Sequence, residues 1–291
     1  MPPTGGPLAL AAVAAPLTRI LSDLHYGDER SRLRDLSALN PLLEGVDTLV
    51  LNGDCCHTQA GAVPEQIAAL RAYFAGWGRP VVFVTGNHDP DISTTHELAL
   101  EDGRVWVTHG DVLFDSIAPW CHLREELIRR LVPIRQRHAP EDWVNLPTRL
   151  LMIREACLGL PCEQLPELHS SPQRAARLAR DLFPPQRALA MLHTWAVAPG
   201  RAARLAAAQR PAAQVVVIGH VHFPGVWRRV GRTVVNTGAF CPPLGALLVD
   251  LAGGHVQVRK IEGLGGAFHP GRVVADFALA PLVAPAMMAT T

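Results

Sequence analysis

The sequence predicts an α/β fold in which helices join parallel strands. Three strand-like apolar segments, residues 17–22, 46–51 and 81–85, alternate with two segments of helical character. Such a βαβαβ order is typical of parallel strands joined by right-handed crossovers. Each of these strands also runs into polar residues, at the edge where open α/β sheets hold their ligands. The strand ends therefore indicate where a functional site should lie.

The helices and hairpin of this first part follow from spacing and turn chemistry. Residues 29–43 predict a helix because leucines recur there at helical spacing. Residues 64–77 predict a second helix, since proline suits its first turn and glycine its exit. The segments 96–100 and 104–108 predict a β-hairpin around Gly103.

Residues 116–211 differ from the rest of the chain. They are rich in Arg, Ala, Leu and Pro and show no strand pattern. We expect a helical cap inserted into a discontinuous catalytic domain made of residues 1–115 and 212–291. The predicted helices of the insert are 123–137, 148–158, 173–182, 186–195 and 201–209.

Strand-like segments resume after the insert. A buried strand is predicted over residues 214–218. Two hairpins should follow it, each around a turn that contains glycine. Their strands are 226–229 with 233–236, and 247–251 with 255–261. We expect no regular structure after Gly263, where periodicity is poor and Gly, Ala and Pro are frequent.

Composition restricts the class of protein. With 291 residues of which 48% are hydrophobic, the chain can bury a large core, so global disorder is excluded. Its six cysteines show no CxxC spacing or disulfide framework, which favours reduced thiols in the cytoplasm. The apolar start lacks the basic segment of a signal peptide, and no run reaches the length of about 18 residues that a membrane span needs. We expect a cytoplasmic protein with peripheral membrane contact as an open alternative.

Charge is uneven along the chain although the net charge is only +1. Residues 116–210 hold 14 Arg against 8 acidic residues, whereas the remainder is acidic. An acidic remainder that can bind cations and a basic segment that can bind anions suit a small phosphorylated substrate. Ordinary solvent-exposed helix faces explain the same charge pattern. No basic stripe with interleaved aromatic residues occurs, so nucleic acid is not expected as a partner.

Metal-type ligands stand at five strand ends. They are Asp23 and His25, Asp54, Asn87 with His88 and Asp89, His109, and the pair His220 and His222. Carboxylate, imidazole and amide groups together suit a dinuclear hydrolytic centre. Asp23, His25 and Asp54 can hold one metal together with one imidazole from the pair His220 and His222. Asp54, Asn87 and His109 can hold the second metal with the other imidazole.

The motifs D-x-H, G-D, G-N-H-D, a single His and G-H-x-H resemble those of the calcineurin-like metallophosphoesterases. The resemblance extends from about Arg19 to Ile261 apart from the insert. It implies a four-layered αββα sandwich that holds two divalent ions, for which we expect manganese, with iron or zinc as alternatives. The implied ligands are Asp23, His25, Asp54 and His222 for the first metal, and Asp54, Asn87, His109 and His220 for the second.

The resemblance also implies a reaction. A metal-bridging hydroxide would hydrolyse a phosphate ester or pyrophosphate, and phosphodiesterase activity is expected. His88 would protonate the leaving group, and Asp89 would orient His88 or its loop. Within the insert, we expect Arg124, Arg130 and His122 to contact the substrate, because guanidinium groups match phosphate oxygens.

Two alternatives stay open. The sequence His109-Gly110-Asp111 just before the insert resembles the UDP-2,3-diacylglucosamine pyrophosphatases of lipid A synthesis, which carry Arg in place of His88. In that case apolar residues of the insert, among them Trp120, Leu127, Leu131, Trp143 and residues 150–152, would line a cleft for acyl chains. The other alternative is a non-catalytic scaffold with the same fold. Asp28 and the remaining histidines, His57 among them, are expected in structural roles.

Overall fold

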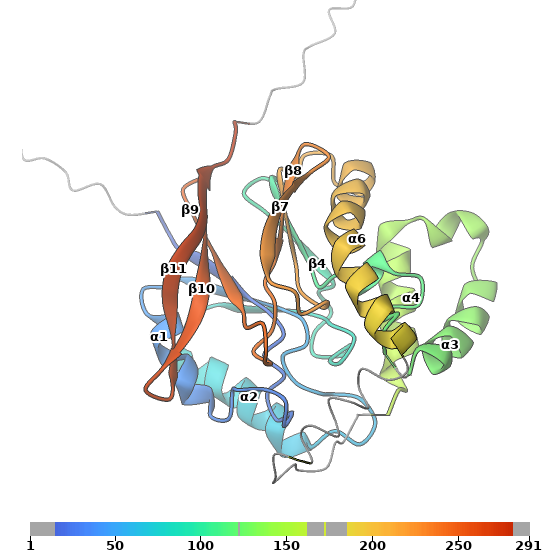
Figure 1. Cartoon of the computed structure of the whole chain (residues 1–291), viewed down its shortest axis with the longest axis horizontal. Helices are drawn as coiled ribbons and strands as arrows, with labels where there is room; N and C mark the ends of the chain where they lie inside the picture. Colours follow the sequence, from blue (N-terminus) through green and yellow to red (C-terminus); the bar gives the residue numbers. More distant parts are fainter. Residues whose placement is uncertain (1–14, 122, 162–171, 173–184, 282–291) are drawn as a thin grey trace, which may run out of the picture.

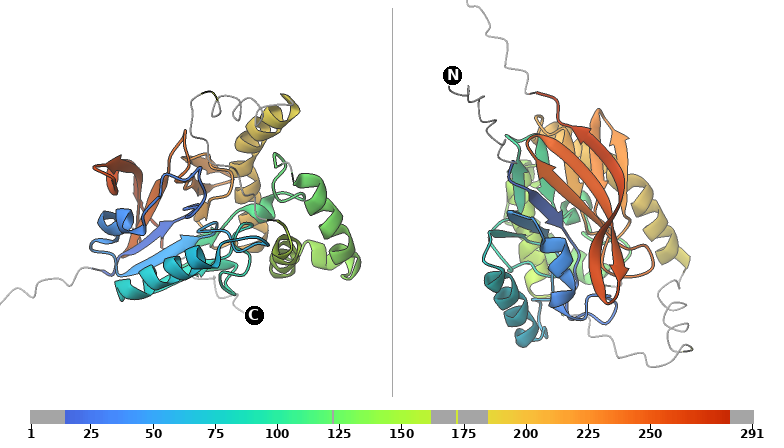
Figure 2. Two further views of the ribbon diagram at one scale, coloured as in Figure 1. Left: turned by 90° about the horizontal axis from the view of Figure 1, so that it is seen from below. Right: turned by 90° about the vertical axis from the view of Figure 1, so that its left-hand side faces the viewer.

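Two β-sheets packed face to face lie between two groups of helices in the computed structural model, which describes residues 15–121, 123–161, 172 and 185–281 (Figure 1). Helices α1 and α2 lie on one side of the sheet pair. The helices α3, α4 and α6 of the insert lie on the opposite side, as the further views in Figure 2 show. The order of layers is therefore helix, sheet, sheet, helix, as the sequence predicts.

The first sheet has six strands in the order β11-β10-β9-β1-β2-β3. Strands β1, β2 and β3 pair in parallel, with Ile20 opposite Val50 and Val50 opposite Val82. This confirms the predicted parallel arrangement. The strands are β1 (Thr18–Leu21), β2 (Thr48–Asn52), β3 (Val81–Val84), β9 (Leu247–Ala252), β10 (His255–Leu264) and β11 (Ala267–Ala278).

The second sheet has five strands in the order β4-β5-β6-β8-β7. Strands β5, β6 and β8 are parallel, so the residues that follow β5 and β6 emerge at one edge. The strands are β4 (Glu97–Leu100), β5 (Val105–Thr108), β6 (Val215–Ile218), β7 (Gly225–Arg229) and β8 (Arg232–Asn236). The insert is thus the connection between the parallel neighbours β5 and β6.

The helices differ in length and role. Those outside the insert are α1 (Asn40–Leu43), which continues a 3-10 turn (Leu36–Leu39), and α2 (Pro64–Trp77). A second 3-10 turn (Asp111–Leu113) precedes the insert. The insert contributes α3 (Arg124–Gln136), a 3-10 turn (Pro140–Trp143), α4 (Leu146–Leu158) and α6 (Pro185–Gln209). No helix among the described residues is both long enough and apolar enough to cross a membrane.

Branched aliphatic side chains fill the space between the sheets. Val50 and Val84 of the first sheet and Val107 and Val217 of the second are fully or almost fully buried there. A second apolar cluster packs α1 and α2 against the first sheet, and a third packs the insert against the second sheet. The insert therefore shares a core with the second sheet, which fixes its position beside the strand ends.

The predicted helix over residues 29–43 was too long. Only residues 36–43 are helical, because polar side chains capture the backbone before them. The Ser31 hydroxyl donates to the Leu24 carbonyl and accepts from the Leu33 N–H. Asp35 then caps the first turn by accepting from the Ser37 N–H.

Two further expectations were wrong. The tail after Gly263 is not irregular, because residues 267–278 form β11, which pairs with β10 through a turn at Gly265 and Gly266. The helices predicted over 186–195 and 201–209 are one helix, α6, which passes through Pro199. Pro199 and Ala198 are buried, so packing offsets the cost of proline there. The helix predicted over 173–182 lies outside the described residues.

Candidate metal centre

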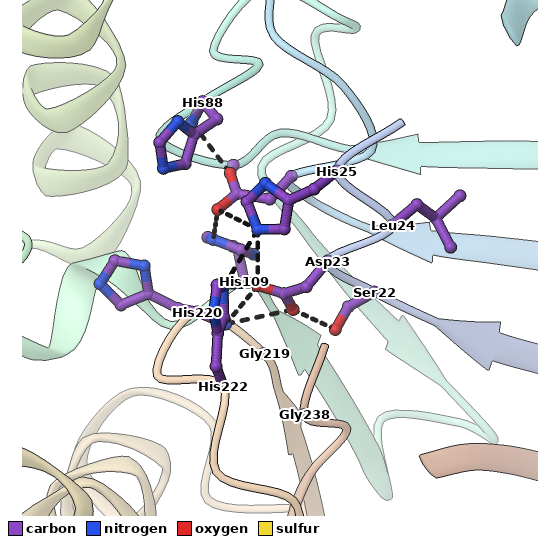
Figure 3. A network of polar contacts seen from close by, with 12 residues as sticks. Ser22, Asp23, Leu24, His25, His88, His109, Gly219, His220, His222 and Gly238 are labelled. Carbon is purple, nitrogen blue, oxygen red and sulfur yellow. Dashed lines mark hydrogen bonds and ion pairs between the residues drawn. The ribbon is translucent and has the colours of Figure 1, made fainter. Parts of the chain in front are cut away.

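Loops from both sheets meet at the carboxyl ends of five strands, β1, β2, β3, β5 and β6. These loops carry the seven ligands predicted from the sequence. In Figure 3, His25, His109 and His222 lie around the Asp23 carboxylate, with His88 and His220 beside them. Residues almost 200 positions apart in the chain thus share one site.

Most of these ligands have an unusual backbone conformation. Asp23, His25, Asp54, His220 and His222 have φ angles of 50°, 46°, 52°, 67° and 53°. Residues other than glycine rarely adopt this left-handed region, which costs about 1–2 kcal/mol per residue. Such strain persists where the surrounding structure holds it, and it is frequent at functional sites. Here it turns each side chain back toward the centre.

The first ligand group consists of Asp23, His25, Asp54 and His222, whose ligand atoms lie within 4.8 Å of one another. His222 Nε2 lies 3.2 Å from Asp23 Oδ1, and His25 Nε2 lies 3.9 Å from Asp54 Oδ2. The Nε2 atoms of His25 and His222 are 3.0 Å apart. Two imidazole nitrogens and two carboxylates that face one another suit a divalent cation with mixed N and O ligands.

The second group consists of Asp54, His109 and His220. Asp54 Oδ2 lies 3.2 Å from His109 Nε2, so the Asp54 carboxylate belongs to both groups. Asn87 Oδ1 is buried and has no hydrogen-bond partner among the described residues. A buried amide oxygen left in this way is explained by a ligand that the protein itself does not supply. The residues present therefore fit divalent metal ions.

Main-chain carbonyls fix which nitrogen two of the histidines, His109 and His220, offer. Asn52 O lies 2.9 Å from His109 Nδ1, and Ile117 O lies 2.9 Å from His220 Nε2. Each carbonyl accepts a hydrogen bond, so the proton sits on that nitrogen and the other nitrogen is left for a metal. His109 thus offers Nε2, whereas His220 offers Nδ1.

Asp89 joins two of the ligand loops. Its carboxylate accepts from the N–H groups of Asp54 at 2.9 Å, Cys55 at 2.7 Å and Gly86 at 2.8 Å. Burial, reinforced by the nearby Asp54 carboxylate, raises the pKa of Asp89 to about 7. Asp89 therefore connects the loop of His88 to the turn that carries Asp54.

His88 lies at the edge of the centre. Its backbone N–H donates to Asp54 Oδ1 at 2.9 Å, and its ring stands edge-on to His25 and to His57, at 5.2 and 4.7 Å between centroids. Removal from water lowers the pKa of His88 to about 3, although Asp54 opposes this shift.

Asp28 and His57, for which the sequence predicts structural roles, lie beside the candidate metal centre. Arg30 binds Asp28 through Nε and Nη2, and His57 Nε2 lies 3.3 Å from Asp28 Oδ2. Burial raises the pKa of Asp28, but the hydrogen bonds from His57 and Arg30 outweigh it and hold the pKa well below its usual range. Although His25, Asp28 and His57 are close enough to hold a cation, Arg30 already compensates the Asp28 charge.

A cleft of about 160 Å³ opens at the centre between the strand ends and the insert. Its polar wall includes Arg30 and Arg187, two arginines that the sequence does not single out. Position alone could have indicated Arg30, five residues after His25. Its apolar wall comes from Ala118, Trp120, Leu123, Leu127 and Leu160 of the insert.

The expected substrate arginines lie elsewhere. Arg130 donates to Glu126 on the same helix at 2.8 Å, and Arg124 lines a separate cavity of about 430 Å³ between α3 and α6. Neither arginine is among the residues that line the cleft at the metal centre. His122 lies outside the described residues. Of the expected acyl-cleft residues, Trp120 and Leu127 do line this cleft, whereas Leu131 lines the separate cavity.

The solved structures to which this chain is similar are distant from it in sequence. Vacuolar Protein Sorting 29 from Cryptosporidium parvum is 12% identical, covers 91% of this chain and 100% of its own, and has a TM-score of 0.41. The phosphoesterase YfcE from E. coli is 18% identical over 91% and 100% of the two chains, with a TM-score of 0.38. A dimetal phosphatase from Danio rerio is 13% identical over 92% and 99%, with a TM-score of 0.43.

No curated protein matches the chain in sequence. The family model of the calcineurin-like phosphoesterases, in contrast, matches residues 18–224, which is well over half of the chain. The matched segment contains every one of the seven predicted metal ligands. The chain belongs to the calcineurin-like phosphoesterase family and is a metal-dependent hydrolase of phosphoric esters.

Proposed function

We propose that the chain binds two divalent cations side by side and hydrolyses a phosphate ester or pyrophosphate between the strand ends and the insert. One observation carries this proposal: the Asp54 carboxylate belongs to two separate ligand groups. A single carboxylate shared by two groups is the arrangement that a dinuclear site needs. Asp23, His25 and His222 would complete the first group, and Asn87, His109 and His220 the second.

The bound cations would supply positive charge for the phosphate oxygens and a water activated for in-line attack on phosphorus. Manganese is the proposed metal, and iron or zinc would also accept these N and O ligands. The protein holds the ligands in place through the carbonyls of Asn52 and Ile117 and through the Asp89 carboxylate.

His88 is the proposed catalytic residue of the protein itself. Its ring lies beside His25, and its backbone N–H contacts the carboxylate that both ligand groups share. From there the imidazole can deliver a hydrogen bond or proton to the oxygen that leaves the phosphorus. Asp89 would support this role through the loop.

Two variants test the proposal. We expect Asp54→Ala to lose bound metal and activity together, because both ligand groups lose a member. His88→Ala should keep its metal and lose about 10²–10⁴-fold in turnover, the usual contribution of a general acid. Metal content by mass spectrometry and hydrolysis of bis-p-nitrophenyl phosphate with added manganese measure these effects.

The exposed residue His255, whose ring contacts Asp276, supplies a control. His255→Ala should change neither metal content nor turnover. If Asp54→Ala and His88→Ala both kept full activity, the proposed centre would be wrong. A wild-type protein that binds metal but hydrolyses no phosphoric ester would favour the scaffold alternative.

The lining of the cleft favours one more specific candidate, a UDP-2,3-diacylglucosamine pyrophosphatase. Arg30 and Arg187 can meet phosphate oxygens, while Trp120, Leu123 and Leu127 offer an apolar surface to acyl chains. We propose that residues 116–211 serve as a cap over residues 1–115 and 212–291. A lipid-linked nucleotide would also agree with a cytoplasmic enzyme in peripheral contact with a membrane. Comparing kcat/KM for UDP-2,3-diacylglucosamine and bis-p-nitrophenyl phosphate decides this question.

A further inference from the structure

Helix α6 of the insert contacts the loop that carries two of the proposed metal ligands. The indole Nε1 of Trp195 donates a hydrogen bond of 2.8 Å to the carbonyl of Val221. Val221 stands between His220 and His222 in the chain. The Trp195 ring also stacks on Phe223, with 4.7 Å between centroids and 12° between planes. Trp195 therefore holds both the middle and the end of this loop.

The sheet holds the beginning of the same loop. Gly219 N donates to His109 O at 2.8 Å, and Asn236 Nδ2 donates to Gly219 O at 2.8 Å. His220 N then contacts the Asp23 carboxylate at 3.1 Å. Beyond His220, Val221 N donates to Gly219 O at 2.8 Å and Phe223 stacks on Trp227 of β7 at 6.0 Å between centroids. The backbone is strained at both histidines. A strained segment keeps its shape when further contacts support it.

The start of the insert adds a second support. Ile117, at the first positions of the insert, is fully buried with a φ angle of 61°, which is rare for a β-branched residue. This conformation accompanies the hydrogen bond between its carbonyl and His220 Nε2. Trp120 packs against the same imidazole at 5.1 Å between centroids. Arg187 of α6 donates to the Trp120 carbonyl at 3.3 Å, so both supports belong to one connected region.

We propose that the insert sets the metal affinity of the centre, and that Trp195 is a positioning residue for His220 and His222. The insert is then a structural part of the centre as well as a wall of the substrate cleft. The inference rests on the proposed metal assignment. It predicts that the loss of a single N–H group in the insert weakens metal binding although Trp195 is not itself a proposed ligand.

Trp195→Phe is the decisive variant, because it keeps a flat ring against Phe223 and removes the N–H group. We expect Mn²⁺ affinity, measured by titration calorimetry on metal-free protein, to fall by about 10-fold. Losses of about 10–100-fold are usual when a residue that orients a ligand is removed. Metal retained after dialysis gives a second readout, independent of activity.

Trp143→Phe is the matched control. Trp143 Nε1 also donates to a main-chain carbonyl in the insert, that of Arg135 at 3.1 Å, but it does not contact the loop. Both variants should lower the melting temperature of the metal-free protein by a similar amount, about 2–4 °C. Only Trp195→Phe should weaken metal binding.

Phe223→Leu keeps the indole donor and removes the ring stack, so it separates the hydrogen bond from general packing. We expect it to lower Mn²⁺ affinity less than Trp195→Phe does. Equal affinity in Trp195→Phe and wild type would overturn the inference and leave the proposed function standing. An equal loss in Trp195→Phe, Trp143→Phe and Phe223→Leu would also overturn it. A wild-type protein that binds no metal would refute the proposed function itself.

Discussion

Gly219 lies so close to the Asp23 carboxylate and the Ser22 hydroxyl that a methyl group would collide with both. Its neighbour His220 depends on this approach, because the His220 N–H contacts the same carboxylate. Gly219 is therefore required because there is no room for a side chain. Its backbone conformation does not require glycine, since its φ angle is not positive. Asp23 gains its position as a ligand partly from this close contact.

Gly219→Ala should lower metal affinity at least 10-fold, because Asp23 and His220 would both have to move. Gly76→Ala is the control, since Gly76 lies within α2 and a methyl group there meets no atom within 4 Å. The control should be neutral or more stable by about 0.5–1 kcal/mol, because alanine favours the helix. Titration calorimetry and urea unfolding measure the two effects. Unchanged metal binding in Gly219→Ala would contradict the geometry of the first ligand group.

At the scale of elements, a buried ion pair joins β1 to β9. Arg19 binds the Asp250 carboxylate through Nε and Nη2, each at 2.7 Å, and its Nη1 donates to Leu42 O. The side chains are 5% and 12% exposed, so water screens the pair little. The strand that leads to Asp23 and His25 is thereby tied to the C-terminal part of the first sheet.

Arg19→Met should destabilise the protein by about 3–5 kcal/mol, because it leaves the Asp250 carboxylate buried without its partner. Arg79→Met is a matched control, since Arg79 and Asp47 form an ion pair in which both side chains are about half exposed. The control should cost less than about 1 kcal/mol. Urea unfolding of both variants gives the comparison, and similar losses would show that burial of the Arg19 pair has little effect.

Local sequence predicted the strands because strand formation depends on neighbours in the chain, and the proposed ligands were placed from their positions at the strand ends. Runs of branched apolar residues predicted the strands β2, β3 and β6, and the proposed ligands follow these strands within a few residues. The helix predicted over residues 29–43 begins only at residue 36, because the side chains of Ser31 and Asp35 form hydrogen bonds with the backbone before it. Strand β11 was missed because it is an exposed strand at the edge of the sheet, where it pairs with β10 alone among the described residues.

The proposed roles of Trp195 and Arg187 could not be predicted, because their partners lie far away in the sequence. Trp195 meets a loop 26 positions away, and Arg187 reaches the carbonyl of a residue 67 positions away. Nothing in the spacing of the insert separates Arg187 from Arg124 or Arg130, since packing alone decides which guanidinium reaches the cleft. The tautomers of His109 and His220 likewise depend on carbonyls that only the folded chain brings near.

At the scale of the whole molecule, the centre forms only where the two sheets meet. Asp23, Asp54 and Asn87 follow strands of the first sheet, whereas His109, His220 and His222 follow strands of the second. A cation bound to both sets joins the two sheets and favours the folded state, because the unfolded chain has no such site.

Metal should therefore stabilise the fold. Manganese at about 100 times its dissociation constant adds about 2.7 kcal/mol, which corresponds to a rise of about 5–10 °C in melting temperature. EDTA should reverse the rise in the wild-type protein. Asp54→Ala should show no such response to manganese, because it lacks the carboxylate that both groups share. If the melting temperature of the wild-type protein were the same with and without manganese, a metal centre that joins the two sheets would be contradicted.

The distribution of the ligands along the chain has a consequence for biosynthesis. Asp23 leaves the ribosome early and His222 late, and β1 also needs β9, at residues 247–252, as a neighbour in its sheet. A nascent chain that still lacks these segments cannot form the complete centre. The complete ligand set can therefore assemble only after these segments have left the ribosome, and a product truncated before His222 would lack part of the proposed centre.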